Sequence, residues 1–300
     1  MNKYSIISMW QNYCYNDNLF LNNLKNNYEY STIDDNIIFL VCGPFINNEN
    51  YYIIKNINCI KILYITEPIE INSQYSLCYD LYKNNIFNII IGCVENNLNS
   101  IKYPLYICYI NLEKKNIFND INNYVKECSL DKKFCTLINT HDNWNTRIPI
   151  YNKLINIGNI VCPSNLLNNC ANEELNNIGN VEYIKKYLFN ICSENTLTSV
   201  NGYITEKIIN SCLGGAIPIY CGWFDEIDEK IFNRNRILFY EPNNEESLNN
   251  VYNKVKELME DNNKLNDFYK MNIFMESAYD TCQMMHNNLF DKIKNLNELI

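Results

Sequence analysis

Short apolar runs separated by polar segments recur along the whole chain. The first five runs are rich in β-branched and aromatic residues and cover residues 4–10, 36–44, 59–68, 86–93 and 103–110. Each run is almost continuously apolar, a pattern typical of strands that are covered on both faces in a parallel α/β sheet. We therefore expect five strands in this part of the chain.

The pattern starts again after a polar, Lys-rich stretch near residues 113–133. Five further apolar runs follow, at residues 134–140, 159–164, 187–194, 215–222 and 236–242. Segments 204–214 and 244–264, and roughly the last 30 residues, have the apolar spacing of helices. We predict two α/β domains, residues 1–130 and residues 131–300, with the C-terminal helices closing the second domain.

Composition narrows the functional class. With 300 residues, 47% of them apolar, the chain can bury a substantial core, and its net charge of −9 argues against general nucleic-acid binding. No run approaches the roughly 18 apolar residues of a membrane-spanning helix, and the N-terminus lacks the apolar core of a signal peptide. We therefore expect a soluble, cytoplasmic protein.

The 14 cysteines and two histidines favour neither a disulfide framework nor a structural zinc site. The cysteines are scattered along the chain, and no two stand at C-x-x-C spacing. We interpret them as small buried residues in a reducing compartment, in preference to a set of disulfides.

Four of the eight glycines lie in one window, residues 193–222, at Gly202, Gly214, Gly215 and Gly222. The order of residue types predicts a strand, a loop, a helix, a Gly-Gly break and a second strand. Glycine permits a tight turn into the helix at its start, and the pair at its end lets the next strand pack closely.

The start of this helix carries Tyr203, Thr205, Glu206 and Lys207. A helix N-terminus offers free backbone N–H groups and a positive dipole end, and an ammonium group within the first turn adds to the attraction for a phosphate. Glu206 is then available for a sugar or ribose hydroxyl. On spacing alone, an ordinary solvated helix start with a capping Glu fits equally well.

The run SENTLTSVNGYITEKIINSCLGGAIPIYCG resembles the signature of the α-1,3-fucosyltransferases of glycosyltransferase family 10. That signature joins E-N-[ST], a [GD]-Y-[VI]-T-E-K helix and an A-[VI]-P-[VI] strand in this order. KILYITEP, INTHDNWNTRIPIYNKL and NIIFLVCGP resemble further family segments more weakly, and residues 71–130 offer little to align.

The resemblance implies an α/β fold of the GT-B type, in which two Rossmann-like domains face a central cleft. The donor, GDP-fucose, would bind the C-terminal domain and an oligosaccharide or glycoconjugate acceptor the N-terminal one. L-Fucose would move with inversion to a glycan hydroxyl, the 3-OH of N-acetylglucosamine, without a metal. Consistently, no two Asp residues stand at D-x-D spacing. We expect a catalytic unit without the membrane anchor and stem of animal family members or the C-terminal heptad repeats of some bacterial ones, and hence a microbial or viral source.

The resemblance also implies roles for single residues. Glu67, at the end of an apolar run, would be the general base, although a surface Glu at a strand end is the alternative. Tyr64 would lie beside it on the acceptor side. Arg147, one of three arginines, and Lys207 would neutralise the departing GDP. Three more residues would contact the donor: Asn195, Tyr203 and Glu206.

Two alternative functions stay open. The T-E-K helix would recognise phosphate and ribose groups that many donors share, so a transferase for another nucleotide sugar is possible. The other is a nucleotide- or glycan-binding protein without catalysis, against which the joint presence of Glu67, Arg147 and Lys207 argues. We expect His141 to be a loop hydrogen-bonding residue, Glu194 to be structural, and Arg234 and Arg236 to make surface or inter-domain contacts.

Overall fold

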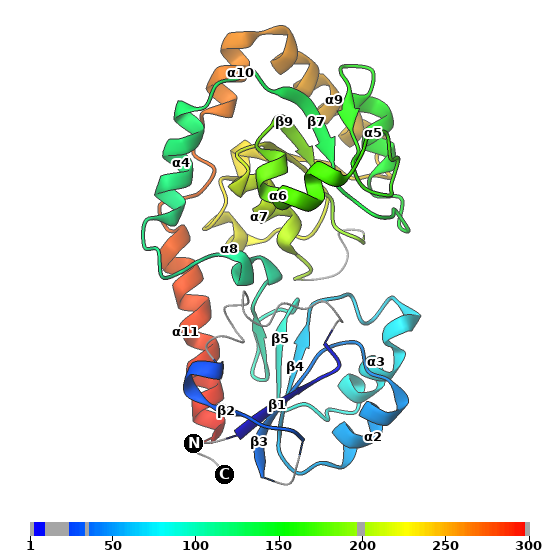
Figure 1. Ribbon diagram of the computed structural model, residues 1–300, viewed down its shortest axis with the longest axis vertical. Coiled ribbons are helices and arrows are strands. Elements are labelled where there is room, and N and C mark those ends of the chain that lie inside the picture. Colours follow the sequence, from blue (N-terminus) through cyan, green and yellow to red (C-terminus); the bar gives the residue numbers. More distant parts are fainter. Residues whose placement is uncertain (1–2, 10–23, 34–35, 197–201, 298–300) are drawn as a thin grey trace. The chain divides into compact units, whose positions relative to one another are not determined.

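The computed structural model describes residues 3–9, 24–33, 36–196 and 202–297 (Figure 1). Trp10 and the loop at 197–201, both included in the predicted segments, lie outside these residues. The chain forms two compact units, which we describe separately. Unit 1 comprises Met1–Asn111, Asn201–Tyr203 and Cys282–Ile300, and unit 2 comprises Leu112–Val200 and Ile204–Thr281.

A six-stranded parallel sheet forms the centre of unit 1, with strand order β2-β1-β3-β4-β5-β6. In β3 and β4 all but one side chain is buried, as the continuous apolar runs predict. The strand bounds are β1 Lys3–Ile7, β2 Glu29–Tyr30, β3 Ile37–Cys42, β4 Ile60–Ile65, β5 Ile89–Gly92 and β6 Ser100–Lys102.

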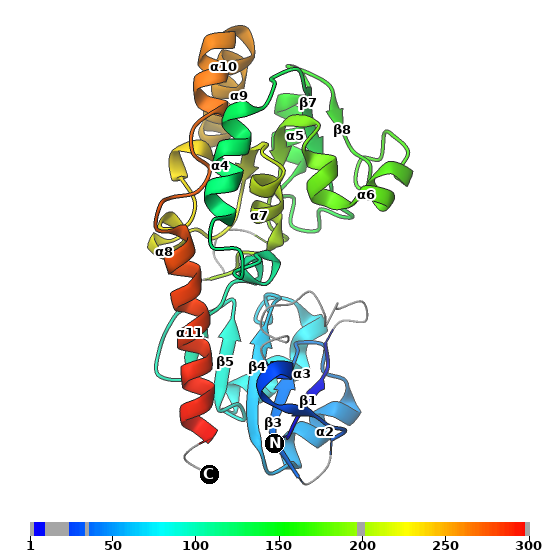
Figure 2. The same cartoon turned by 60° about the vertical axis from the view of Figure 1, so that its left-hand side comes forward.

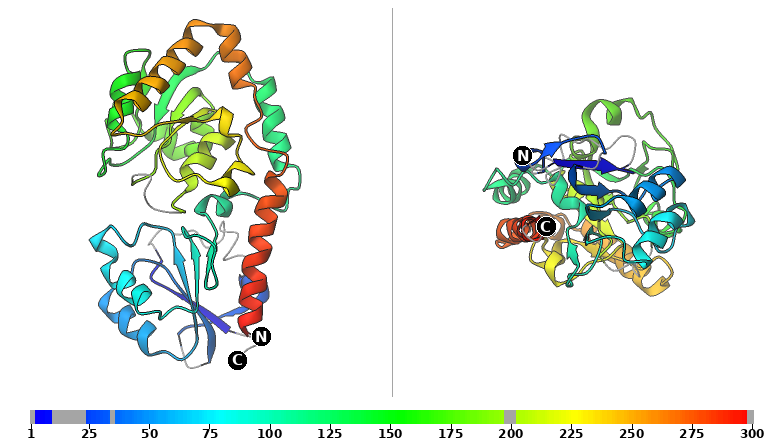
Figure 3. Two further views of the ribbon diagram at one scale, coloured as in Figure 1. Left: turned by 180° about the vertical axis from the view of Figure 1, so that it is seen from behind. Right: turned by 90° about the horizontal axis from the view of Figure 1, so that it is seen from below.

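Helices cover both faces of this sheet. Helices α2 (Asn48–Asn56) and α3 (Ser76–Lys83) lie side by side on one face, and α11 (Ala278–Asn297) runs along the other (Figures 1 and 3). Asn47 begins α2, because its side chain accepts a hydrogen bond from the backbone N–H of Asn50. Helix α11 is one continuous helix, of which the part from Cys282 onwards belongs to unit 1 (Figure 2).

One predicted strand is wrong. Residues 103–110 form a 3-10 helix, Leu105–Tyr109, after the short strand β6. Pro104 precedes it, and the side chains of Leu105 to Cys108 are all buried. A short run buried on every side has no apolar periodicity, so its sequence does not distinguish a strand from a helical turn. Two strands were not predicted: the exposed two-residue strand β2 and the three-residue strand β6.

Unit 2 contains a five-stranded parallel sheet with strand order β11-β10-β9-β7-β8. Helix α5 packs against α9, and α6 packs against α7. The strands are β7 Lys133–Leu137, β8 Ile160–Val161, β9 Tyr187–Ile191, β10 Ile217–Tyr220 and β11 Leu238–Phe239. The helices are α4 Ile117–Glu127, α5 Ile148–Leu154, α6 Glu173–Ile184, α7 Glu206–Leu213, α8 Glu226–Glu229, α9 Glu245–Glu260 and α10 Asn262–Tyr269.

Both helical segments predicted for this half are present. Segment 204–214 contains α7, and segment 244–264 contains α9 and the start of α10. The second segment divides at Asp261, whose side chain accepts hydrogen bonds from the backbone N–H groups of Asn263 and Lys264. This cap starts α10 where the apolar spacing alone predicted one continuous helix.

The strand order in unit 2 places a topological switch point between β7 and β9. The chain runs from β7 to β8 on one side of β7 and then crosses to β9 on the other side. Helices on either side of such a point leave a crevice at the carboxyl ends of the strands, where ligands of open parallel sheets bind. Unit 1 has the corresponding point between β1 and β3.

Arg236 has a different position from the one predicted. It is fully buried in unit 2, where its guanidinium donates hydrogen bonds to the carbonyl oxygens of Gly215, Ala216 and Tyr269. These three acceptors fix the Gly-Gly break after α7 against the end of α10. Arg236 is therefore a structural residue of the core and not a surface contact, whereas Arg234 is exposed.

The cysteines of the described residues are free thiols, and most of them are buried, in agreement with the prediction. In the same part of the chain, no helix combines the length and the apolar character that crossing a membrane requires.

His286 is expected to make unit 1 sensitive to acid. Its ring is buried in α11, with Nδ1 3.0 Å from the Tyr103 hydroxyl, and burial lowers the pKa of His286 to about 4. The unfolded chain protonates His286 more readily than the folded chain does. The free energy of unfolding is therefore unaffected by this group above pH 6.5, and it falls between pH 6.5 and pH 4 by about 1.4 kcal/mol per pH unit. Urea unfolding of wild type and His286→Gln from pH 7 to pH 4.5 measures it: the variant should lose less stability, and equal losses would contradict the assignment.

Candidate active site

A polar pocket of about 410 Å³ lies at the switch point of unit 2. Residues that follow β7, residues of β9 and the first turn of α7 line it. Among these are several groups able to hydrogen bond to a polar ligand, namely Asn139, His141, Asn190, Asn195, Glu206 and Lys207. The pocket therefore combines the expected ligand position of a parallel sheet with a helix N-terminus.

The first turn of α7 forms one wall of this pocket. Thr205 is the N-cap residue, and its hydroxyl oxygen lies 3.5 Å from the backbone nitrogen of Lys207. The Lys207 ammonium lies 3.1 Å from the same hydroxyl and 3.6 Å from the Glu206 carboxylate. An ammonium group held over a helix N-terminus favours anion binding at this wall.

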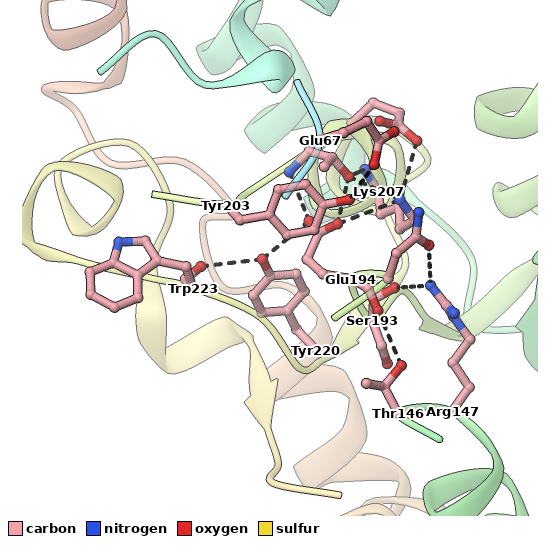
Figure 4. A network of polar contacts seen from close by, with 12 residues as sticks. Glu67, Thr146, Arg147, Ser193, Glu194, Tyr203, Lys207, Tyr220 and Trp223 are labelled. Atoms are coloured by element: carbon pink, nitrogen blue, oxygen red, sulfur yellow. Dashed lines mark hydrogen bonds and ion pairs between the residues drawn. The ribbon is translucent and has the colours of Figure 1, made fainter. Parts of the chain in front are cut away.

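Glu194 supports this turn from inside the core. Its fully buried carboxylate accepts hydrogen bonds from the backbone N–H and the hydroxyl of Thr205, each 2.7 Å long (Figure 4). Lys207 Nζ and the Tyr220 hydroxyl lie at 3.4 and 3.3 Å. Burial raises the pKa of Glu194, and the positive charge of Lys207 opposes that shift. The carboxylate thus fixes the cap and the ammonium together.

Arg147 lies at the N-terminus of α5 and is almost fully buried. Its Nη2 donates to the Ser193 carbonyl at 2.8 Å (Figure 4) and to the Asn195 side chain, also at 2.8 Å. Its Nη1 donates to the His141 carbonyl at 2.9 Å. Arg147 Nε has no hydrogen-bond partner among the described residues. Arg147 therefore orients Asn195 towards the pocket. His141 takes part in this cluster only through its backbone carbonyl, and the residue also lines the pocket.

Asp142 is a site residue that sequence reasoning missed. Its side chain accepts hydrogen bonds from the backbone N–H groups of Thr146, Arg147 and Ile148, and it lies 3.6 Å from the Arg147 guanidinium. An Asp placed six residues before the start of α5 is the only signal in the sequence, and it resembles many surface caps. Asp142 anchors the N-terminus of α5 and hence the buried arginine.

Ser193 and Tyr240 complete the buried network. The Tyr240 hydroxyl donates to the Thr146 carbonyl at 2.6 Å and also contacts the Ser193 hydroxyl. The Thr146 hydroxyl in turn donates to the Glu194 carbonyl at 3.1 Å. The segment that follows β9 is thereby joined to the start of α5, so the residues of the pocket are held on a rigid frame.

Three of the predicted residues belong to unit 1. Glu67 follows the carboxyl end of β4 and is half-buried, and the Tyr203 hydroxyl donates to its Oε2 at 3.3 Å (Figure 4). Tyr64 lies within β4 and is fully buried, with its hydroxyl 2.9 Å from Cys108 Sγ. Because Tyr64 exposes no surface to a ligand, we do not include it in the proposed acceptor site.

The predicted residues thus form two groups. Asn195, Glu206 and Lys207 line the pocket of unit 2, which Arg147 supports through Asn195. Glu67 and Tyr203 form a hydrogen-bonded pair in unit 1. Within the described parts of the chain, no three His, Cys, Asp or Glu side chains gather as a metal site would require.

The family model of the glycosyltransferase family 10 (fucosyltransferase) C-terminal region matches residues 128–297, more than half of the chain. The chain belongs to glycosyltransferase family 10. It is therefore a glycosyltransferase, and the family indicated by the T-E-K helix is confirmed. A sequence search of curated proteins finds no match to this family 10 chain.

Solved structures described as α1,3-fucosyltransferase share the fold of this family 10 enzyme. One superposes with a TM-score of 0.68 at 18% identity and covers 97% of this chain and 90% of its own. Structures described as complexes with GDP-fucose and with GDP each give a TM-score of 0.66 at 18% identity. The GDP-fucose complex covers 96% of this chain and 89% of its own, and the GDP complex covers 97% of this chain and 90% of its own. The predicted α/β fold of the GT-B type is confirmed.

Proposed function

We propose that this family 10 enzyme is an inverting α-1,3-fucosyltransferase that uses GDP-fucose. Unit 2 binds the donor, and unit 1 binds a glycan that offers the 3-OH of N-acetylglucosamine. The pocket at the switch point of unit 2 carries this proposal, because it joins a helix N-terminus, an ammonium group and polar side chains at one ligand position. The solved relatives described with GDP-fucose and GDP support the choice of donor.

The donor is held mainly by charge. Its diphosphate lies at the start of α7, where the helix dipole and Lys207 neutralise it, and Glu206 accepts a hydrogen bond from a sugar or ribose hydroxyl. Asn195 binds the donor from the opposite wall in the orientation that Arg147 gives it. The Arg147 guanidinium is buried and donates hydrogen bonds to protein carbonyl groups. Arg147 therefore acts on the donor through its positive charge and not by direct contact.

The transfer step is a displacement at the anomeric carbon of fucose. The acceptor oxygen forms a bond to this carbon while Glu67 takes the hydroxyl proton, a contribution of typically 10² to 10⁴-fold to the rate. The bond from the anomeric carbon to the phosphate oxygen breaks, and GDP leaves with its electron pair. Lys207 and Arg147 stabilise the charge that develops on that oxygen, so the proposed step runs without a metal.

Binding measurements separate this proposal from the alternatives. Calorimetric titration in EDTA should detect GDP and GDP-fucose, whereas UDP-galactose and UDP-N-acetylglucosamine should give no heat of binding. GDP-mannose serves as a control for the sugar, since it shares the nucleotide and diphosphate. Binding of a UDP sugar, or binding only with added metal, would contradict the donor assignment. Binding of GDP-fucose without transfer to any N-acetylglucosamine acceptor would favour a binding protein.

A further inference from the structure

The two residues Gly202 and Tyr203 connect parts of the chain with different roles. They belong to unit 1, whereas the next residue, Ile204, already belongs to unit 2. Helix α7, which carries the proposed donor-binding Lys207, begins only two residues further on, at Glu206. The residues that lead into α7, which we call the donor helix, therefore belong to the same unit as the proposed base.

Gly202 fixes this entry by close backbone packing. Its φ of +76° lies in the left-handed region, and a Cβ added there would lie 2.8 to 3.0 Å from the backbone N, C and O atoms of Val94. Backbone atoms cannot move aside as a side chain can, so position 202 requires glycine. Val94 follows β5, which pairs with β4, the strand that precedes Glu67.

Tyr203 uses this fixed position to reach Glu67. Its ring is 1% exposed, which limits its rotation, and its hydroxyl donates to Glu67 Oε2 at 3.3 Å (Figure 4). A hydrogen bond donated to a carboxylate favours the ionised form and restricts its orientation. Both effects benefit a general base, which must be ionised and aimed at the acceptor proton.

We propose that Tyr203 is a positioning residue for Glu67, and that Gly202 and Tyr203 together join the general base to the donor helix. This role differs from the donor contact that the family resemblance implies for Tyr203. It rests on the proposed function, because it needs Glu67 to be the base. Two residues that shortly precede α7 would thus favour the ionised form of the carboxylate that follows β4 and fix its orientation.

The Tyr203→Phe variant tests the hydrogen bond. Fucose transfer should slow by about tenfold, as expected for one hydrogen bond to a charged group, and the acid side of the pH–rate profile should move about one pH unit higher. Affinity for GDP, measured by calorimetry, should stay within about twofold of wild type. Tyr51→Phe is the matched control, since Tyr51 also donates to a carboxylate of unit 1, that of Asp80 at 2.6 Å, and it should leave the profile unchanged.

The outcomes distinguish this inference from the proposed function. A fall in GDP affinity without a shift of the acid side would make Tyr203 a donor contact and overturn the positioning role. If the wild-type enzyme transfers no fucose from GDP-fucose, the proposed function fails. If Glu67→Gln retains the wild-type rate of transfer, the base assignment fails and the positioning role with it, while the transferase function stands. If Glu67→Gln is inactive while Tyr203→Phe has a wild-type profile and rate, only the positioning role is overturned.

The Gly202→Ala variant tests the tether. A methyl group at 202 must displace the segment from Val94, so we expect the same shift of the acid side as in Tyr203→Phe. Gly179→Ala is the matched control, because Gly179 also has a positive φ, +78°, but no atom lies within 4 Å of its added Cβ. The control should lose stability without a change in the profile. A wild-type acid side in folded Gly202→Ala would overturn the tether.

Discussion

The Glu67→Gln variant should lower the rate of fucose transfer by 10² to 10⁴-fold, the usual range for a general base. The amide retains the size of the side chain and can still accept the hydrogen bond from Tyr203, but it cannot take the acceptor proton. The pocket proposed to bind the donor belongs to unit 2, so GDP affinity should not change. Single-turnover assays with GDP-fucose and an N-acetylglucosamine acceptor measure the rate, and calorimetry measures the affinity.

Glu70→Gln is the control for this experiment. Glu70 lies three residues further along the same segment and is exposed, so its neutralisation removes one negative charge from the same region without touching the proposed base. It should keep the wild-type rate. A Glu67→Gln enzyme as fast as the Glu70→Gln enzyme would rule out Glu67 as the base and leave the acceptor side of the mechanism without an assigned residue.

Most strands of the two sheets follow from the sequence because parallel strands bury both faces. Strands such as β3 and β4 need an unbroken apolar run, and little else in a chain of this composition produces one. Residues 103–110 satisfy the same condition but form a 3-10 turn. What decides between the two is the space that the rest of unit 1 leaves for this segment, and that information is not local.

The polar pocket of unit 2 was predictable where its residues are neighbours in sequence. Glu206 and Lys207 stand in the first turn of one helix, so a single motif finds them. The contacts that make this turn rigid join residues far apart, such as Glu194 with Tyr220. A buried carboxylate and a surface carboxylate have the same letter in the sequence. The sequence indicated a structural role for Glu194, but only the fold shows that its carboxylate is buried and which groups it binds.

For Arg147, the sequence indicated the importance of the residue but not its binding partners. The scarcity of arginine in this chain indicated a special role, and the structure does give Arg147 one. Its guanidinium, however, is occupied by the carbonyl groups of His141 and Ser193 and by Asn195. The planar fork that grips phosphate oxygens can equally bind protein acceptors, and the sequence does not say which acceptors are near.

Removal of the Lys207 charge should affect both stability and catalysis, because this ammonium balances a buried carboxylate. In Lys207→Met, Glu194 keeps its bonds to Thr205 but loses the cation 3.4 Å away. Removing one partner of a buried ion pair lowers the free energy of unfolding by about 3 kcal/mol, because the other charge stays buried without compensation. Transfer should also slow by about 10²-fold, the effect typical of losing one group that stabilises a leaving oxygen.

The pH dependence and a double variant separate these two effects. Burial already raises the pKa of Glu194, and Lys207 opposes the shift, so Lys207→Met should raise that pKa further. A carboxyl group with a raised pKa destabilises the fold as pH rises through it, so the deficit of Lys207→Met should shrink towards low pH. Adding Glu194→Gln removes the unbalanced charge and should restore most of the stability measured by urea unfolding, while transfer stays slow. Recovery of the rate together with the stability would show that Lys207 serves only the fold, and the charge at the departing GDP would then have to be neutralised by the helix dipole and Arg147.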